Sequence, residues 1–110
     1  MYKIKGSVWI EGNDGAFIGM GRVLLLEKIK EFGSITLAAK SMKMSYRSAW
    51  ELINSMNKQS DSPLVETTSG GIGGGGTRIT KEGEKAIKLF RDLQSRFHKF
   101  NEEESKRLKF

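Results

Sequence analysis

The fold is decided between Gly33 and Met56, where the sequence reads GSITLAAKSMKMSYRSAWELINSM. Ser34 and Ser45 can each cap a helix, because a serine hydroxyl accepts a hydrogen bond from a free backbone N–H of the first turn. Apolar residues follow both serines at the spacing of one helix face. They are Ile35, Ala38, Ala39 and Met42 after the first serine, and Ala49, Leu52, Ile53 and Met56 after the second. Two capped helices separated by a short break have the layout of a helix-turn-helix, whose second helix lies in the DNA major groove.

The outer face of the second helix, residues 45–58, is the candidate DNA-reading surface. Inward packing of the apolar stripe leaves these residues pointing outward: Arg47, Ser48, Glu51, Asn54, Ser55 and Lys58. Arg47 can donate two hydrogen bonds to guanine, and Asn54 is the residue type that pairs with adenine. Trp50 borders both faces and is expected to pack against the protein.

Phosphate contacts are expected around the turn. The helix N-terminus at Ser45 and Tyr46 can hold a phosphate, and Lys40 and Lys43 flank the turn. Polar faces of this kind are common on small basic domains, and helix pairs with short turns are common in bundles. The helix pair alone therefore does not decide for DNA binding.

A glycine-rich hairpin follows the helix pair. Residues 64–68 and 77–79 indicate two short strands, and Gly70–Gly76 would form their tip. Because glycine has no Cβ, such a tip can approach the sugar-phosphate chain or the minor groove, and Arg78 can add a contact there. This order, a helix-turn-helix followed by a hairpin and a capped helix, is that of a winged helix. A nucleotide-binding loop does not fit, since no Lys-Ser/Thr pair or helix follows the glycines; a hairpin tip without a ligand remains an alternative.

We predict the following set of DNA-contacting residues: Ser34, Lys40, Lys43, Ser45, Tyr46, Arg47, Ser48, Glu51, Asn54, Lys58, Gly73, Gly74 and Arg78.

Two further elements precede the helix pair. The β-branched segment 3–11 and residues 16–18 flank Gly12-Asn13-Asp14-Gly15, a strong turn signal, and predict an N-terminal β-hairpin. Leu25, Ile29 and Phe32 then recur at helical spacing and predict a helix over about 20–32 that ends at Gly33.

The last predicted helix, residues 81–104 after a Thr80 cap, carries a long apolar stripe. Its residues Phe90, Leu93, Phe97 and Phe100 recur at the coiled-coil step of three and four. An aromatic stripe of this length favours a homodimer interface, which implies a palindromic DNA site. The alternative is that the helix packs on Trp9 and the first hairpin of the same chain.

Composition limits the other functions. The 110 residues carry 19 Lys+Arg against 13 Asp+Glu, a net charge of +6, with no cysteine and one histidine, His98. Disulfides, thiol nucleophiles and cysteine zinc sites are thereby excluded, and no paired carboxylates or metal-ligand spacing is visible. We therefore predict no enzyme, no cofactor and no metal. A mean hydropathy of −0.44 and the lack of a long apolar run predict a soluble, cytoplasmic protein without a membrane partner.

The motifs closely resemble the DNA-binding domain of the molybdate-responsive regulators of the ModE family. The resemblance is carried by segments 33–40, 44–52 and 63–66 and by the glycine run with Thr77. It implies a dimeric winged helix with a helix-turn-helix of the LysR type that binds an operator, while separate β-barrels bind molybdate in those regulators. By this resemblance Ser45, Tyr46 and Arg47 open the recognition helix. Because the sequence ends at Phe110, we expect that this chain does not bind molybdate.

The sequence thus predicts an α+β winged helix in a single domain, with a helix-turn-helix at 34–58, a wing at 64–79 and a C-terminal helix at 81–104. The predicted function is that of a sequence-specific transcriptional regulator that binds double-stranded DNA as a homodimer. The alternative is a winged-helix module that binds a protein and does not read DNA sequence.

Overall fold

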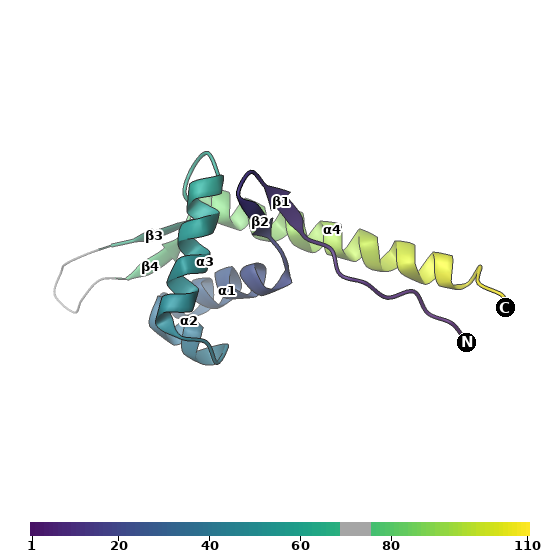
Figure 1. Cartoon of the computed structure of the whole chain (residues 1–110). Helices are drawn as coiled ribbons and strands as arrows, with labels where there is room; N and C mark the ends of the chain where they lie inside the picture. The colour runs from purple at the N-terminus through teal and green to yellow at the C-terminus, as the bar shows by residue number, and fades with distance from the viewer. Residues whose placement is uncertain (69–75) are drawn as a thin grey trace.

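The computed structural model describes residues 1–68 and 76–110 and has the predicted α+β fold. Its elements are β1 (Ile10–Gly12), β2 (Gly15–Ile18), α1 (Met20–Phe32), α2 (Ile35–Ser41), α3 (Tyr46–Gln59), β3 (Val65–Thr67), β4 (Thr77–Ile79) and α4 (Lys81–Ser105). Helices α1 to α3 form a compact head from which α4 extends, with the N-terminal segment beside it (Figure 1). The molecule measures 64 × 28 × 21 Å, and its radius of gyration of 16.7 Å exceeds the value of about 13 Å for a compact chain of this length.

The helix boundaries follow the predicted caps. Ser34 Oγ accepts a hydrogen bond from Leu37 N at 3.1 Å, and Ser45 Oγ accepts one from Ser48 N at 3.0 Å. Helix α1 ends at Gly33, which adopts a left-handed backbone with φ of 64° and donates its N–H to Ile29 O. Local sequence signals therefore placed the start of α2, the start of α3 and the end of α1 correctly.

The core lies between α1 and the helices that cover it. It contains Val23, Leu25, Leu26 and Ile29 of α1, Ile35, Ala38 and Ala39 of α2, Ala49, Ile53 and Met56 of α3, and Phe90 of α4. Phe32 shares the helical spacing of Leu25 and Ile29, but unlike them it is exposed. It is the last residue of α1, and the chain turns away at Gly33, so its ring stays at the surface with Lys28 Nζ 5.9 Å from its centroid.

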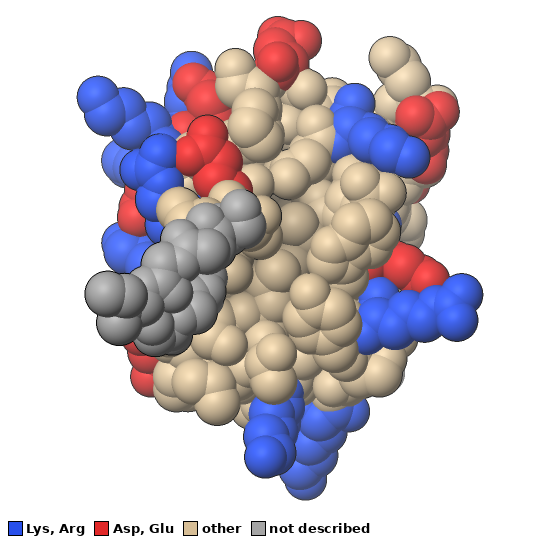
Figure 2. All heavy atoms as spheres, turned by 90° about the vertical axis from the view of Figure 1, so that its left-hand side faces the viewer, with Lys and Arg blue, Asp and Glu red and all other residues tan. Residues whose placement is uncertain are grey.

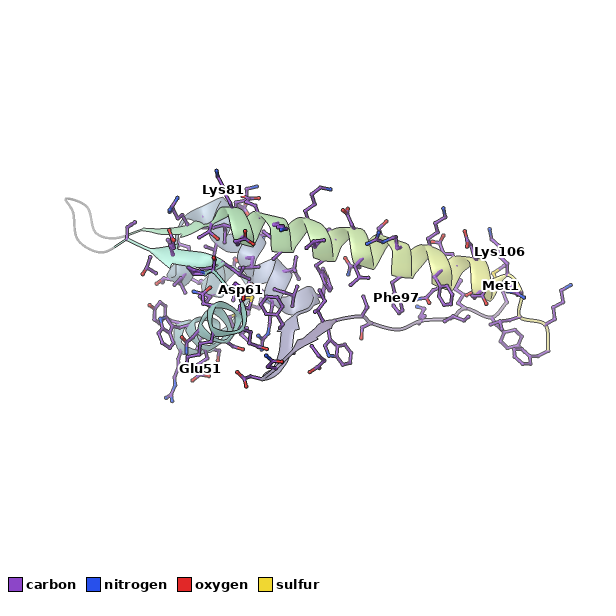
Figure 3. All side chains as sticks on the ribbon, turned by 90° about the horizontal axis from the view of Figure 1, so that it is seen from above. Met1, Glu51, Asp61, Lys81, Phe97 and Lys106 are labelled. Carbon is purple, nitrogen blue, oxygen red and sulfur yellow. The ribbon has the colours of Figure 1, made fainter. Side chains whose placement is uncertain are left out.

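The N-terminal hairpin is shorter than predicted. β1 and β2 pair antiparallel around Asn13-Asp14, with Gly12 opposite Gly15, which confirms the turn. Residues 3–9, expected to extend the first strand, are not in a strand, because β2 ends at Ile18 and α1 begins at Met20. The N-terminal segment instead runs along α4, where Ile4 N–H donates to Ser105 Oγ at 2.7 Å. Figure 3 shows Phe97 on the side of α4 that faces this segment, and Met1 at the same end as Lys106.

An ion pair joins α4 to α1. Arg91 Nε donates to Glu27 Oε2 at 3.1 Å, and a second guanidinium nitrogen donates to the other carboxylate oxygen. The hydrogen bond to Glu27 raises the pKa of Arg91 above its ordinary value, against a smaller opposing effect of burial. This bidentate pair links α4 to α1 beside the core contact made by Phe90.

Candidate DNA-binding surface

The outer face of α3 presents polar side chains to solvent. The Arg47 side chain is 89% exposed. Its Nε lies 3.1 Å from Oε1 of Glu51, which is four residues later and therefore about one turn further along the helix. Figure 3 shows Glu51 on the side of α3 that faces away from α4. An exposed ion pair of this kind contributes at most about 1 kcal/mol, so Arg47 can leave Glu51 for a stronger partner. Lys58 is exposed on the same face, and Asn54 is half-buried.

The serines of the predicted set have a structural role. The hydroxyls of Ser34 and Ser45 cap α2 and α3, and Ser45 Oγ also donates to Ser48 Oγ at 2.9 Å. These side chains therefore contribute by positioning the two helices, while the first backbone N–H groups of α3 remain at the exposed surface. Ser55, expected to point outward, is half-buried and accepts a hydrogen bond from Arg22 at 3.0 Å.

The turn between α2 and α3 places two lysines at the surface. Lys40 and Lys43 are both exposed. Lys43 has φ of 56°, a left-handed conformation that a residue with a Cβ adopts at a cost. Its N–H donates to Lys40 O at 3.1 Å, and the next N–H, of Met44, donates to Ala39 O. The turn therefore holds a lysine where glycine would be conformationally easier.

Replacing Lys43 with glycine is expected to stabilise the fold while weakening DNA binding. The free energy of unfolding should rise by about 0.5–1 kcal/mol, since glycine adopts positive φ without the Cβ conflict but loses more entropy on folding. Lys43 is predicted to contact a phosphate, so loss of its ammonium group should lower the slope of log affinity against log salt concentration by about one. Thermal unfolding and fluorescence anisotropy measure the two effects. Lys40→Ala, within α2, is the control that should weaken binding without the gain in stability; a destabilised Lys43→Gly protein would contradict the prediction.

The hairpin of β3 and β4 lies beside α3 and forms the wing (Figure 1). Its strands pair antiparallel with Glu66 opposite Arg78, and Arg78 lies 2.6 Å from the Glu66 carboxylate. Thr77 N–H donates to Gly33 O at 3.1 Å, which attaches the wing to the junction of α1 and α2. The predicted contacts at Gly73 and Gly74 lie outside the described residues.

Asn57 connects the reading helix to the wing and was not identified from the sequence. Its Oδ1 accepts hydrogen bonds from Leu64 N at 2.8 Å and Val65 N at 3.2 Å, and its Nδ2 donates to Val65 O at 3.0 Å. Three hydrogen bonds from one side chain hold α3 and the start of β3 in a fixed relation. A polar residue on an amphipathic helix gives no sequence signal for this role, because its partners come from a later loop.

Two aromatic predictions need correction. Trp50 was expected to pack against the protein but is exposed, because α3 turns its apolar stripe of Ala49, Ile53 and Met56 toward the core. Phe90 was assigned to a subunit interface but is fully buried in the chain's own core. The reason is that α4 begins against the head and only its later turns extend beyond it (Figure 1).

The other predicted interface residues differ in exposure. Leu93 and Phe97 are half-buried, and a Cβ placed on Gly6 would lie 3.4 Å from the Phe97 ring, so the N-terminal segment covers part of that ring. Phe100 is 59% exposed, and Leu89 is exposed as well. Leu89, Leu93 and Phe100 lie along one face of α4. Phe90 and Phe97 lie at the adjoining edge of the same apolar stripe, since Leu93 is three residues from Phe90 and four from Phe97.

Metal-ligand clusters and membrane-spanning helices were two further possibilities for the part of the chain that the structure describes. Residues 1–68 and 76–110 contain no group of three His, Asp or Glu side chains arranged to hold a metal ion. Within the same residues, no helix is both long enough and apolar enough to cross a membrane.

The fold is a winged helix-turn-helix of the DNA-binding class. Three features define it: the helix-turn-helix, the wing that Asn57 holds to its second helix, and the exposed polar face of that helix. The chain belongs to the lysR family of bacterial regulatory helix-turn-helix proteins, whose model matches residues 21–84.

Several curated relatives carry the ModE name, which confirms the resemblance seen in the motifs. The chain is 48% identical over 80 residues to the transcriptional regulator ModE of Haemophilus influenzae. The aligned segment covers 73% of this chain and 31% of that protein. It is 37% identical over 94 residues to the molybdenum transport protein ModE of Azotobacter vinelandii, covering 86% of this chain and 35% of the relative. The DNA-binding transcriptional dual regulator ModE of Escherichia coli K12 is 46% identical over 69 residues, or 63% and 26% of the two chains. The chain thus spans about a third or less of each relative.

Proposed function

We propose that this chain is the DNA-binding unit of a cytoplasmic transcriptional regulator and that it binds a palindromic operator as a homodimer. The observation that carries this proposal is the rigid link between α3 and the wing through Asn57. It lets one body present a polar helix to a major groove and a hairpin to the adjacent backbone at the same time. The net charge of +6 favours a polyanionic partner.

The reading step follows from the side chains of α3. Arg47 exchanges the carboxylate of Glu51 for the acceptor atoms of a guanine, a bidentate contact of the kind most often used for specific reading. Glu51, once released, can accept a hydrogen bond from a cytosine amino group. Lys40, Lys43 and Lys58 contact phosphates, and Arg78 at the wing contacts the flanking backbone after leaving Glu66.

The homodimer is proposed to form through α4. The face that carries Leu89, Leu93 and Phe100 extends beyond the head, and exposed aromatic and aliphatic residues on a helix of this kind are typical of an interface. Two-fold pairing through α4 would place two α3 helices on one side of the duplex, about one helical turn or a multiple of it apart.

Replacing Arg47 with alanine is expected to change which sequences are bound, and replacing Arg78 with alanine is expected to weaken binding to all sequences alike. Loss of a bidentate base contact costs about 1–3 kcal/mol of binding free energy at the base pair that is read. Loss of a phosphate contact instead lowers the slope of log affinity against log salt concentration by about one. Selection of bound sequences from random DNA, followed by anisotropy at several salt concentrations, measures both. No retention of the chain on DNA at low salt would reject the proposal in favour of a protein-binding winged helix.

A further inference from the structure

An exposed aromatic pair lies on α3. Tyr46 is 53% exposed and Trp50 is 47% exposed. The two positions are four residues apart, so their side chains are neighbours on the helix surface. Tyr46 and Trp50 are named the aromatic patch below.

Asn57 shows on which side of α3 Tyr46 and Trp50 lie. Positions 46, 50 and 57 follow one another at steps of four and seven, so they share one side of α3. Asn57 uses that side to bind Leu64 and Val65 at the base of the wing. Tyr46 and Trp50 therefore lie toward the wing, next to the face of α3 that carries Arg47.

The charges around the aromatic patch indicate its partner. Lys40, Lys43 and Arg47 are exposed on α2, on the turn and on the first turn of α3. Figure 2 views the molecule from the wing side and shows uncharged residues across the middle of this face, with Lys and Arg side chains at its lower and lateral edges and Asp and Glu side chains among them, chiefly toward the top. The DNA major groove has the complementary arrangement, since phosphates line its rims and the 5-methyl group of thymine is the apolar group on its floor.

We propose that Tyr46 and Trp50 contact thymine 5-methyl groups in the major groove and add a preference for thymine beside the positions read by Arg47. The inference rests on the proposed function, because it takes α3 to lie in that groove. It extends the reading surface beyond hydrogen-bonding residues to an indole that the sequence pattern predicted would be packed inside.

The test uses a fluorescein-labelled duplex obtained by selecting bound sequences from a random DNA pool. Each thymine is replaced in turn by deoxyuridine, which removes the 5-methyl group and leaves the pairing edge unchanged. Affinities are measured by anisotropy with the full chain and with its Trp50→Ala and Trp9→Ala variants. Trp9 is the matched control, because it is 54% exposed and lies just before β1, away from the aromatic patch.

The unsubstituted protein is expected to bind roughly three- to fivefold more weakly when a contacted thymine becomes uracil, the loss that corresponds to one buried methyl group. Trp50→Ala is expected to bind the thymine and uracil duplexes equally at that position, because the partner of the methyl group is gone. Trp9→Ala should keep the ratio of the original protein. Trp50→Phe should keep part of the ratio, and it provides the same comparison if the alanine variant does not fold.

Two results would overturn the inference and leave the proposed function in place. One is an operator whose thymines can all be replaced by uracil without loss of affinity. The other is a Trp50→Ala variant that keeps the thymine-to-uracil ratio of the original protein at every thymine. A chain that binds no DNA duplex at low salt would instead overturn the proposed function, so the two failures are distinguishable.

Discussion

Replacing Phe90 with alanine is expected to lower the free energy of unfolding by about 3–5 kcal/mol, the range for removing a fully buried phenyl ring from a core. The Phe90 side chain has no exposed surface and belongs to the cluster that joins α4 to α1, α2 and α3. Its removal leaves a cavity that these helices cannot close without moving. Because small domains are stable by only about 5–15 kcal/mol, this one change should bring the fold near its limit of stability. Chemical unfolding followed by circular dichroism at fixed protein concentration measures the loss.

Phe100→Ala is the matched control on the same helix. The Phe100 ring is 59% exposed in the single chain, so its removal should change the stability of the fold by no more than about 0.5 kcal/mol. For the proposed homodimer, Phe100→Ala should instead shift the equilibrium between dimer and monomer toward monomer, as measured by sedimentation velocity over a range of concentrations. Equal destabilisation by the two alanine variants would contradict the division of the aromatic stripe into a core part and an exposed part.

Replacing Gly83 with alanine is expected to destabilise the protein by about 2–3 kcal/mol, as overpacking of a close contact does. Gly83 is buried in the first turn of α4, where a Cβ would overlap the carbonyl oxygen of Leu64 and lie 2.6 Å from Ile79 Cγ2. The obstacle is partly backbone, so a side-chain rotation cannot remove it. Since Leu64 and Ile79 belong to the base of the wing, the wing should also move and DNA affinity should fall. Thermal unfolding and anisotropy on one duplex measure the two losses.

Gly21→Ala is the control for Gly83. Gly21 lies in α1, and a Cβ there would meet nothing within 4 Å. Alanine should therefore stabilise the protein by about 0.5–1 kcal/mol, the usual gain when alanine replaces glycine inside a helix. Opposite signs for the two substitutions are the specific expectation; a stabilising Gly83→Ala would mean that α4 does not approach the wing as closely as the structure has it.

The parts of the fold that were predictable depend on short-range interactions. The caps at Ser34 and Ser45 and the stop at Gly33 were correct because each depends on hydrogen bonds to residues three or four positions away. The β1–β2 turn at Asn13-Asp14 was correct for the same reason. The length of the first strand was wrong because strand pairing needs a partner, and the partner strand β2 has only four residues.

The residue types of the candidate site could be predicted from the sequence, but their contacts with one another and with the wing could be predicted only in part. Arg47, Ser48, Glu51 and Lys58 of α3 lie on an exposed face as expected, since the apolar stripe sets the rotation of an amphipathic helix, whereas Asn54 and Ser55 are half-buried. Asn57 was missed because its partners, Leu64 and Val65, are in the next loop. The ion pairs of Arg47 with Glu51 and of Arg78 with Glu66 were also missed, although positions 47 and 51 have the spacing of a helical pair.

The amino-acid sequence by itself determined where the helices begin and end, which face of α3 is polar and which family the motifs resemble. These properties depend on capping, periodicity and turn chemistry, which act between neighbouring residues. Only the tertiary structure decided which aromatic residues are buried. Phe90 lies inside the core, Phe97 lies against the N-terminal segment, and Trp50 and Phe100 remain exposed. The physical reason is that burial depends on which distant segment covers a side chain, and the same apolar spacing occurs on covered and uncovered faces.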